Sequence, residues 1–94
     1  MLLPSLNGLR AFEAAARHMS FTRAAVELGC CQSTVTVHIR ALERELGVSL
    51  FERNRSSKRV ILTDEGKRAL EYAQRLLALA NEVQEVISPG ASAG

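Results

Sequence analysis

Aromatic side chains are scarce in this 94-residue sequence, which has no tryptophan, one tyrosine and three phenylalanines. A chain of this length can bury one small hydrophobic core, but it is too short to hold a deep active-site cavity beside that core. Alanine and leucine supply most of the 47% hydrophobic content, and this balance favours closely packed helices. The sequence therefore predicts one mainly α-helical unit.

Long apolar runs and a disulfide framework are also missing. No apolar stretch approaches the roughly 20 residues of a membrane-spanning helix, and the first residues lack the basic and apolar segments of a secretory signal. The two cysteines, Cys30 and Cys31, are adjacent, so a disulfide between them would form a strained ring. We expect a cytoplasmic protein with reduced thiols, no cofactor and no membrane partner.

Positive charge is concentrated in the first two thirds of the chain. Residues 1–63 carry nine Lys or Arg and five Asp or Glu, a net charge of +4, whereas residues 64–94 carry three and five, a net charge of −2. A polyanion would therefore bind to the first part of the chain.

Three short helices are predicted over residues 5–18, 21–28 and 32–46, because apolar residues recur there at helical spacing. The expected inward positions are Leu9, Phe12, Ala16 and Met19 in the first helix, Ala24, Ala25 and Leu28 in the second, and Val35, Ile39, Leu42 and Leu46 in the third. Ser5 or Asn7 can cap the first helix and Ser20 the second, while Gly29 and Gly47 can end the second and third. Two helices joined by a short turn at a glycine form the helix-turn-helix layout.

A β-hairpin is predicted over residues 50–63, where two short apolar arms flank a polar and basic tip. Thr63 can cap a last helix that should reach residue 87. The predicted fold class is therefore mainly α: a winged helix-turn-helix of three helices plus a short β-hairpin wing, followed by a long dimerising linker helix. We assign residues 1–63 to the DNA-binding domain, 64–88 to the linker helix and 89–94 to a hinge or disordered tail.

The third helix presents a second, polar face opposite its apolar one. An α-helix fits the major groove, where glutamine can pair with adenine, threonine or valine can meet a thymine methyl group, and arginine can reach guanine or a phosphate. The basic wing can follow the DNA backbone or enter the minor groove. The predicted DNA-binding residues are Gln32, Ser33, Thr36, Val37 and Arg40 on the helix and Arg53, Arg55, Lys58 and Arg59 on the wing.

The last helix carries an apolar stripe in a heptad pattern. Its members are Ala69, Tyr72, Ala73, Leu76, Leu79, Ala80, Val83, Val86 and Ile87. Three short helices cannot cover a stripe of this length, so the distal half of the helix should pair with a second copy of the chain. A dimer would read two DNA half-sites roughly 34 Å apart, which is one helical turn.

Other interpretations of these features remain open at this stage. The basic hairpin taken alone could be a solvated loop, and the third helix could bind a protein, although its polar face offers no apolar patch for a partner. His38 should pack or hydrogen-bond at the edge of the core, and Glu43 should pair with a nearby arginine. Because no metal-ligand set, nucleophile pair or carboxylate cluster is present, we expect no enzyme.

Several motifs match a known family. The chain carries Leu9-x-x-Phe12, Ser20-Phe-Thr-Arg-Ala-Ala25, Leu28, Gln32-Ser33, Ile39-x-x-Leu42-Glu43, Leu46-Gly47, Leu50-Phe51-x-Arg53 and Leu62-Thr63-x-x-Gly66. With these it resembles LysR-type transcriptional regulators over nearly its whole length, and its opening looks most like the branch of the glycine-cleavage and β-lactamase regulators. Two departures are Cys30 and Cys31, where the family usually has an aliphatic residue and then Ser or Thr, and Val37, where it usually has a polar or basic residue.

The resemblance implies an N-terminal DNA-binding domain that dimerises through a linker helix and binds double-stranded DNA. Full-length members of the family add a two-lobed effector-binding domain and often form tetramers. A small-molecule effector would bind only through that second domain, for which this sequence has no segment.

Overall fold

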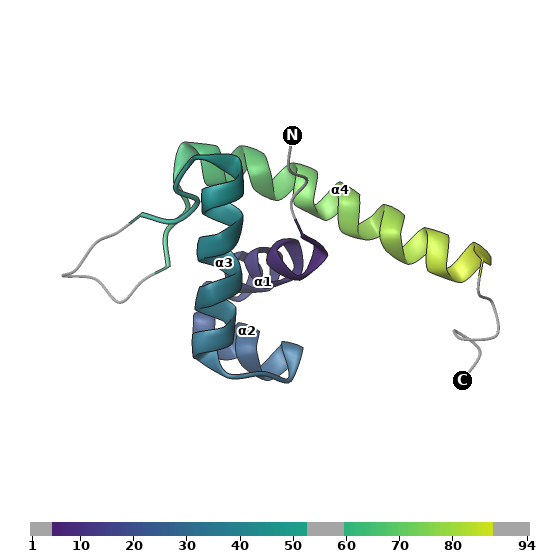
Figure 1. The fold of residues 1–94 in the computed structure, drawn as a ribbon, viewed down its shortest axis with the longest axis horizontal. Coiled ribbons are helices and arrows are strands. Elements are labelled where there is room, and N and C mark those ends of the chain that lie inside the picture. The colour runs from purple at the N-terminus through teal and green to yellow at the C-terminus, as the bar shows by residue number, and fades with distance from the viewer. Residues whose placement is uncertain (1–4, 53–59, 88–94) are drawn as a thin grey trace.

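The computed structural model describes residues 5–52 and 60–87, and these residues form four helices (Figure 1). The helices are α1 (Leu6–His18), α2 (Phe21–Leu28), α3 (Gln32–Leu46) and α4 (Asp64–Ile87). All the predicted helices are present with nearly the expected boundaries. The predicted wing residues Arg53, Arg55, Lys58 and Arg59 and the predicted tail lie outside the described residues.

Side chains and glycines set the helix ends as predicted. Ser5 Oγ accepts a hydrogen bond from Gly8 N at 3.1 Å, Ser20 Oγ from Arg23 N at 3.1 Å, and Thr63 Oγ1 from Gly66 N at 2.9 Å. Each bond satisfies an amide that the first helical turn leaves free. Gly29 and Gly47 follow α2 and α3 with φ angles of 69° and 73°, a left-handed conformation that glycine adopts without steric cost.

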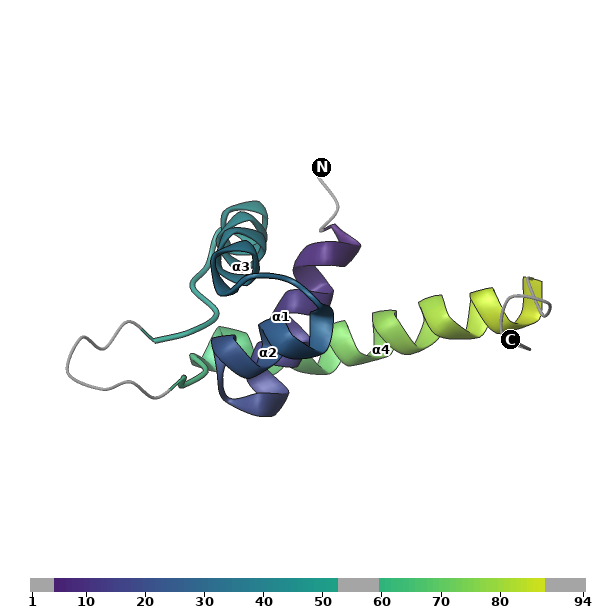
Figure 2. The same ribbon diagram turned by 90° about the horizontal axis from the view of Figure 1, so that it is seen from below.

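The core is centred on α1, which contacts the other three helices, while α2 also contacts α3 (Figure 2). Its largest fully buried side chains are Phe12, Leu42, Leu50 and Val35. The ring of Phe51 meets Phe12 and Phe21 edge to face, with centroid distances of 5.5 and 5.4 Å. These aromatic contacts attach the start of the hairpin to α1 and α2.

The two arms of the predicted hairpin pair at their base. Phe51 and Leu62 form an antiparallel bridge. Glu52 N donates a hydrogen bond to Ile61 O at 2.7 Å, and Thr63 N donates one to Leu50 O at 3.0 Å. The segment that enters residues 53–59 and the segment that leaves them are therefore held side by side.

Three residues that we expected to face inward are wrongly assigned. Leu28 is 36% exposed, Leu46 is 41% exposed and Met19 is 63% exposed. Leu28 and Leu46 are the last residues of α2 and α3, and Met19 has already left α1 with a φ angle of 52°. Helical spacing predicts the side of a helix on which a residue lies, but not whether a neighbouring helix still covers that point.

An ion-pair cluster joins the end of α1 to α2. The Arg17 guanidinium donates to Glu13 Oε2 and to Glu27 Oε1, both at 2.8 Å, and His18 Nε2 lies 2.8 Å from the same Glu27 oxygen. The hydrogen bonds from Arg17 and then from His18 lower the pKa of the Glu27 carboxyl from 4.5 to about 2. The cluster is exposed, so water and salt screen its contribution to stability.

Glu27→Gln should lower the melting temperature slightly at pH 7. A carboxyl with a depressed pKa stabilises the folded state fully above its unfolded pKa of 4.5, and this contribution is lost as the pH falls toward about 2. The difference between wild type and variant should therefore shrink over that range and should also shrink in high salt. Thermal unfolding followed by circular dichroism measures this, with Glu45→Gln as the control at a carboxylate for which the described residues give no ion pair. A difference that stays constant down to pH 2 would contradict the role of this cluster.

Candidate nucleic-acid interface

The outward face of α3 is accessible on the surface of the protein. Gln32, Ser33 and Arg40 are exposed, Val37 is 61% exposed and Thr36 is half-buried. The opposite face of the same helix is anchored, because Val35, Ile39 and Leu42 are buried in the core. The structure therefore brings the five residues predicted from α3 onto one accessible, rigidly supported surface.

The N-terminus of α3 lacks a side-chain cap. Cys31 occupies the N-cap position, and its thiol makes no capping hydrogen bond, unlike the hydroxyls of Ser5, Ser20 and Thr63. The first turn of α3 contains no acidic residue. The first turn of α3 therefore places no acidic side chain of its own at the positive end of the helix dipole, which suits a phosphate group.

Gln32, the first residue of α3, accepts hydrogen bonds both at its backbone carbonyl and at its side-chain oxygen. Its backbone carbonyl accepts from Thr36 Oγ1 at 3.2 Å. Its side-chain Oε1 accepts from Thr22 Oγ1, on α2, at 3.3 Å. Neither contact was predicted from the sequence, although Thr22 lies within one of the motifs that carry the family resemblance.

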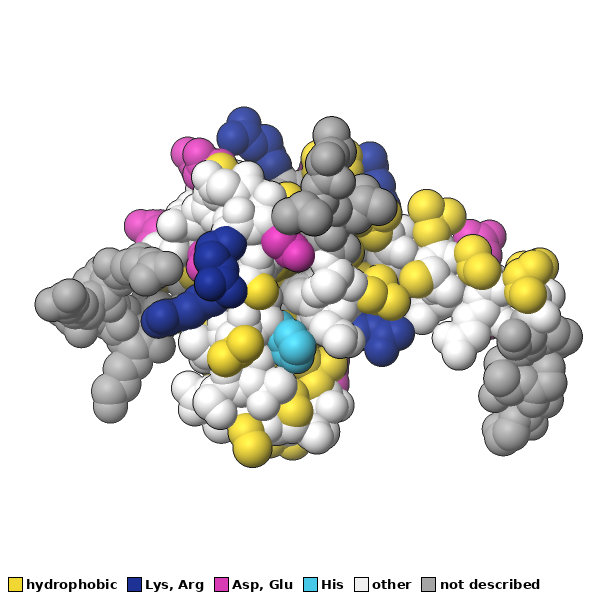
Figure 3. Space-filling model, viewed as in Figure 1, with side chains coloured by type: hydrophobic (Ala, Val, Ile, Leu, Met, Phe, Trp, Pro, Cys, Tyr) yellow, Lys and Arg dark blue, Asp and Glu magenta, His cyan; other side chains and the backbone are white. Residues whose placement is uncertain are grey.

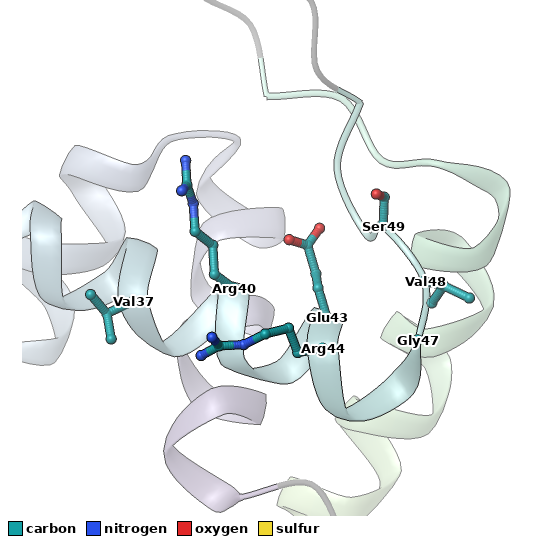
Figure 4. Close-up of a pocket in the computed structure, with 7 residues that line it drawn as sticks. All are labelled: Val37, Arg40, Glu43, Arg44, Gly47, Val48 and Ser49. Carbon is teal, nitrogen blue, oxygen red and sulfur yellow. The ribbon is translucent and has the colours of Figure 1, made fainter.

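We call the exposed side of α3 from Gln32 to Arg40 the reading face. A hollow lies beside it, between the second half of α3 and the turn that follows this helix (Figure 4). Its lining residues are Val37, Arg40, Glu43, Arg44, Gly47, Val48 and Ser49. Glu43 Oε2 accepts a hydrogen bond from Leu50 N at 2.7 Å and so ties α3 to the start of the hairpin. Arg44, Val48 and Ser49 were not predicted as site residues. Arg44 lies on α3 beyond the predicted face, and the positions of Val48 and Ser49 depend on how the chain turns after Gly47.

Two arginines of α3 line the hollow. The space-filling view shows Lys and Arg over the middle of α3 (Figure 3), and the two arginines of the hollow are both exposed. A cationic hollow next to a polar helix face can accommodate the phosphate backbone of a nucleic acid. His38, on the flank of α3, is half-buried as expected for a residue at the edge of the core.

The two cysteines at the turn between α2 and α3 are free thiols, with Cys30 half-buried and Cys31 exposed. Among residues 5–52 and 60–87, no three His, Cys, Asp or Glu side chains are grouped in a way that could hold a metal ion. None of the described helices is long and apolar enough to cross a membrane.

The second exposed surface is the apolar stripe of α4, which extends beyond the other helices (Figures 1 and 3). Its exposed members are Tyr72, Leu76, Leu79, Val83, Val86 and Ile87. Ala69 and Ala80 are half-buried. Ala73 is a correction to the predicted stripe, because its side chain is 0% exposed within the core of its own chain and leaves no surface for a partner.

Comparison with known proteins places the chain in a family. The family model described as bacterial regulatory helix-turn-helix protein, lysR family, matches residues 6–67. The RuBisCO operon transcriptional regulator of Allochromatium vinosum is 46% identical over 83 residues, which cover 88% of this chain and 27% of the relative. The glycine cleavage system transcriptional activator of Escherichia coli K12 is 54% identical over 65 residues, 69% of this chain and 21% of the relative. The chain thus spans about a quarter of the length of these regulators.

Solved structures agree with this assignment. The C199D variant of full-length OxyR from Pseudomonas aeruginosa superposes with a TM-score of 0.86 at 33% identity, over 96% of this chain and 29% of that one. The DNA-binding domain of BenM in complex with benA site 1 DNA superposes with a TM-score of 0.82 at 36% identity, over 96% of this chain and 99% of that one. These relatives are transcriptional regulators and not enzymes. The chain belongs to the LysR family of bacterial regulatory helix-turn-helix proteins, as a winged-helix DNA-binding domain.

Proposed function

We propose that the chain binds double-stranded DNA in a sequence-specific manner, as a dimer on a dyad-symmetric operator, with α3 in the major groove. The observation that carries this proposal is the exposed face from Gln32 to Arg40 on a helix whose other face is locked in the core. A rigid helix that presents polar groups can match the donor and acceptor pattern of base edges.

Two related structures support DNA as the partner. The BenM domain was solved with benA site 1 DNA, and the CbnR domain was also solved as a DNA complex. Our chain covers 99% of the BenM domain and 98% of the CbnR domain, so the comparison extends over the complete DNA-binding unit in each case.

Each residue of the reading face has a distinct role in the proposal. Gln32 pairs with adenine, and Arg40 reaches guanine or a phosphate. Thr36 already donates its hydroxyl proton to Gln32 O, so it offers DNA its methyl group or an accepting lone pair. Val37 can make only apolar contacts, which favours a thymine methyl group at the position that it faces.

The wing supplies the second contact in this proposal. Arg53, Arg55, Lys58 and Arg59 follow the backbone or enter the minor groove. Their positions lie outside the described residues, but the paired arms at Phe51 and Leu62 attach this segment to the same core as α3. The hollow around Arg40 and Arg44 lies beside the α3 contact and suits a phosphate of the bound strand.

The exposed apolar stripe of α4 forms the dimer interface in this proposal. Six large side chains, each more than a third exposed, occupy one side of a helix of 24 residues. Covering them with the same stripe of a second copy removes this apolar surface from water. Effector binding and tetramer formation stay predictions for a longer protein that carries the family's second domain.

Arg40→Ala tests the role of α3 directly. The variant should lose about 1–3 kcal/mol of affinity for a specific duplex and become less selective, because a contact to a base edge is removed. Fluorescence anisotropy on a selected duplex and on a random one measures both quantities. Arg68→Ala removes the same charge from α4 and should leave selectivity unchanged. Unchanged affinity of Arg40→Ala for both duplexes would contradict the placement of α3.

A further inference from the structure

We propose that Thr22 is a positioning residue that fixes the side chain of Gln32 and thereby sets the base preference of α3. Thr22 lies on α2 and does not belong to the reading face of α3. Its hydroxyl donates a hydrogen bond to Gln32 Oε1 at 3.3 Å. The inference rests on the proposed function, in which Gln32 contacts a base. It adds a residue of α2 to the determinants of sequence preference.

Gln32 needs such a support because the helix itself provides little for its side chain. It is the first residue of α3, so no preceding turn of the same helix lies beside its side chain. Both Gln32 and Thr22 are exposed, so packing does not fix the amide. Among the described residues, the Thr22 hydroxyl is the hydrogen-bond partner of the Gln32 side chain.

The donor of this hydrogen bond is held firmly. Thr22 is the second residue of α2, a helix capped by Ser20. The same helix is anchored by buried Ala24 and Ala25 and by Phe21, whose ring contacts Phe51. The backbone of Thr22 is therefore held in place by the core. The side chain of Gln32, by contrast, has three rotatable bonds.

The geometry leaves the reading groups of Gln32 available. A carbonyl oxygen has two lone pairs, and Thr22 uses one of them, so Oε1 can still accept from an adenine amino group while Nε2 donates to the ring nitrogen. The hydrogen bond contributes little in water. It becomes more effective when DNA excludes water from the turn, and an amide that is already oriented loses less freedom on binding.

The test is a double-mutant cycle on the whole chain, read out as base preference. Thr22→Val keeps the shape of the side chain and removes the hydroxyl. Gln32→Ala first identifies the base pair at which preference depends on Gln32, using duplexes that differ at single positions. At that pair Thr22→Val should reduce the preference several-fold and leave the affinity for random duplexes and the melting temperature unchanged. Thr22→Ser should retain the preference, and Thr22→Val should have no further effect in the Gln32→Ala background.

The outcomes separate the inference from the proposed function. If Thr22→Val weakens binding to all duplexes alike, or does so equally in the Gln32→Ala background, Thr22 acts on the DNA backbone by itself and the inference is overturned. An unchanged preference in Thr22→Val also overturns it. If Gln32→Ala changes no base preference while Arg40→Ala does, Gln32 is not a reader and the inference fails although the proposed function stands. If neither variant changes any preference, both fail.

Discussion

Gly66→Ala is expected to destabilise the folded chain by about 3 kcal/mol. A Cβ atom at this position would lie 2.1 Å from Leu50 O and 3.0 Å from Leu50 C. Leu50 O already accepts a hydrogen bond from Thr63 N at 3.0 Å. The first turn of α4 therefore rests directly on the backbone at the start of the wing, and an alanine there forces the two apart.

The expected loss of stability is opposite in sign to the usual effect of this substitution in a helix. Replacing glycine by alanine inside a helix normally stabilises it by roughly 0.5–1 kcal/mol. Gly8→Ala is the matched control in α1, because its added Cβ would meet Leu42 Cβ and Ser5 Oγ at 3.3 Å without reaching a backbone atom closer than 3.4 Å. Urea denaturation should give a change within about 1 kcal/mol for Gly8→Ala. A Gly66→Ala variant as stable as the wild type would show that α4 does not pack on Leu50 as described.

Leu76→Asp should weaken dimerisation by about 100-fold or more and give monomers at micromolar concentration. In a symmetric dimer the substitution places one carboxylate from each copy in an apolar contact, and the cost of removing these charges from water amounts to several kcal/mol. Leu76 is 46% exposed in the single chain, so the three-helix core should keep its fold. Sedimentation velocity measures the association state, and circular dichroism checks the fold.

Asn81→Asp is the control for this prediction. It introduces the same charge on α4, with a smaller change of shape, at an exposed residue outside the apolar stripe. Asn81 lies beside Leu28 and Leu77 in a groove between α4 and the first two helices, and the variant should remain a dimer. If Leu76→Asp sediments as a dimer while keeping its fold, the stripe of α4 is not the interface.

The helices could be predicted from the sequence because their ends are local features. Ser20, Gly29 and Gly47 act on amides and carbonyls within a few residues of themselves, so their effect can be inferred without knowing the fold. The inward faces of α1 to α3 followed from spacing for the same reason. Leu28 and Leu46 could not be predicted correctly, because their exposure depends on where a neighbouring helix stops covering them.

The reading face of α3 could also be predicted, since it consists of the residues left after the buried stripe is assigned. The contacts that support it could not. Thr22 meets Gln32 only because α2 and α3 cross at a particular angle, and Glu43 meets Leu50 only because the chain turns back after α3. Gly66 stood in a recognised motif, but its role as the point where α4 contacts Leu50 depends on a distance between segments.

Selection of bound sequences from a pool of random duplexes tests the central claim most directly, because it requires both specific reading and a symmetric dimer. The 94-residue chain should enrich an interrupted palindrome whose half-sites are centred roughly 34 Å apart, or a multiple of that distance, on one face of the DNA. The absence of any enriched sequence would contradict specific DNA reading and would favour a protein-binding role for α3. Enrichment of a single half-site without dyad symmetry would contradict the dimer.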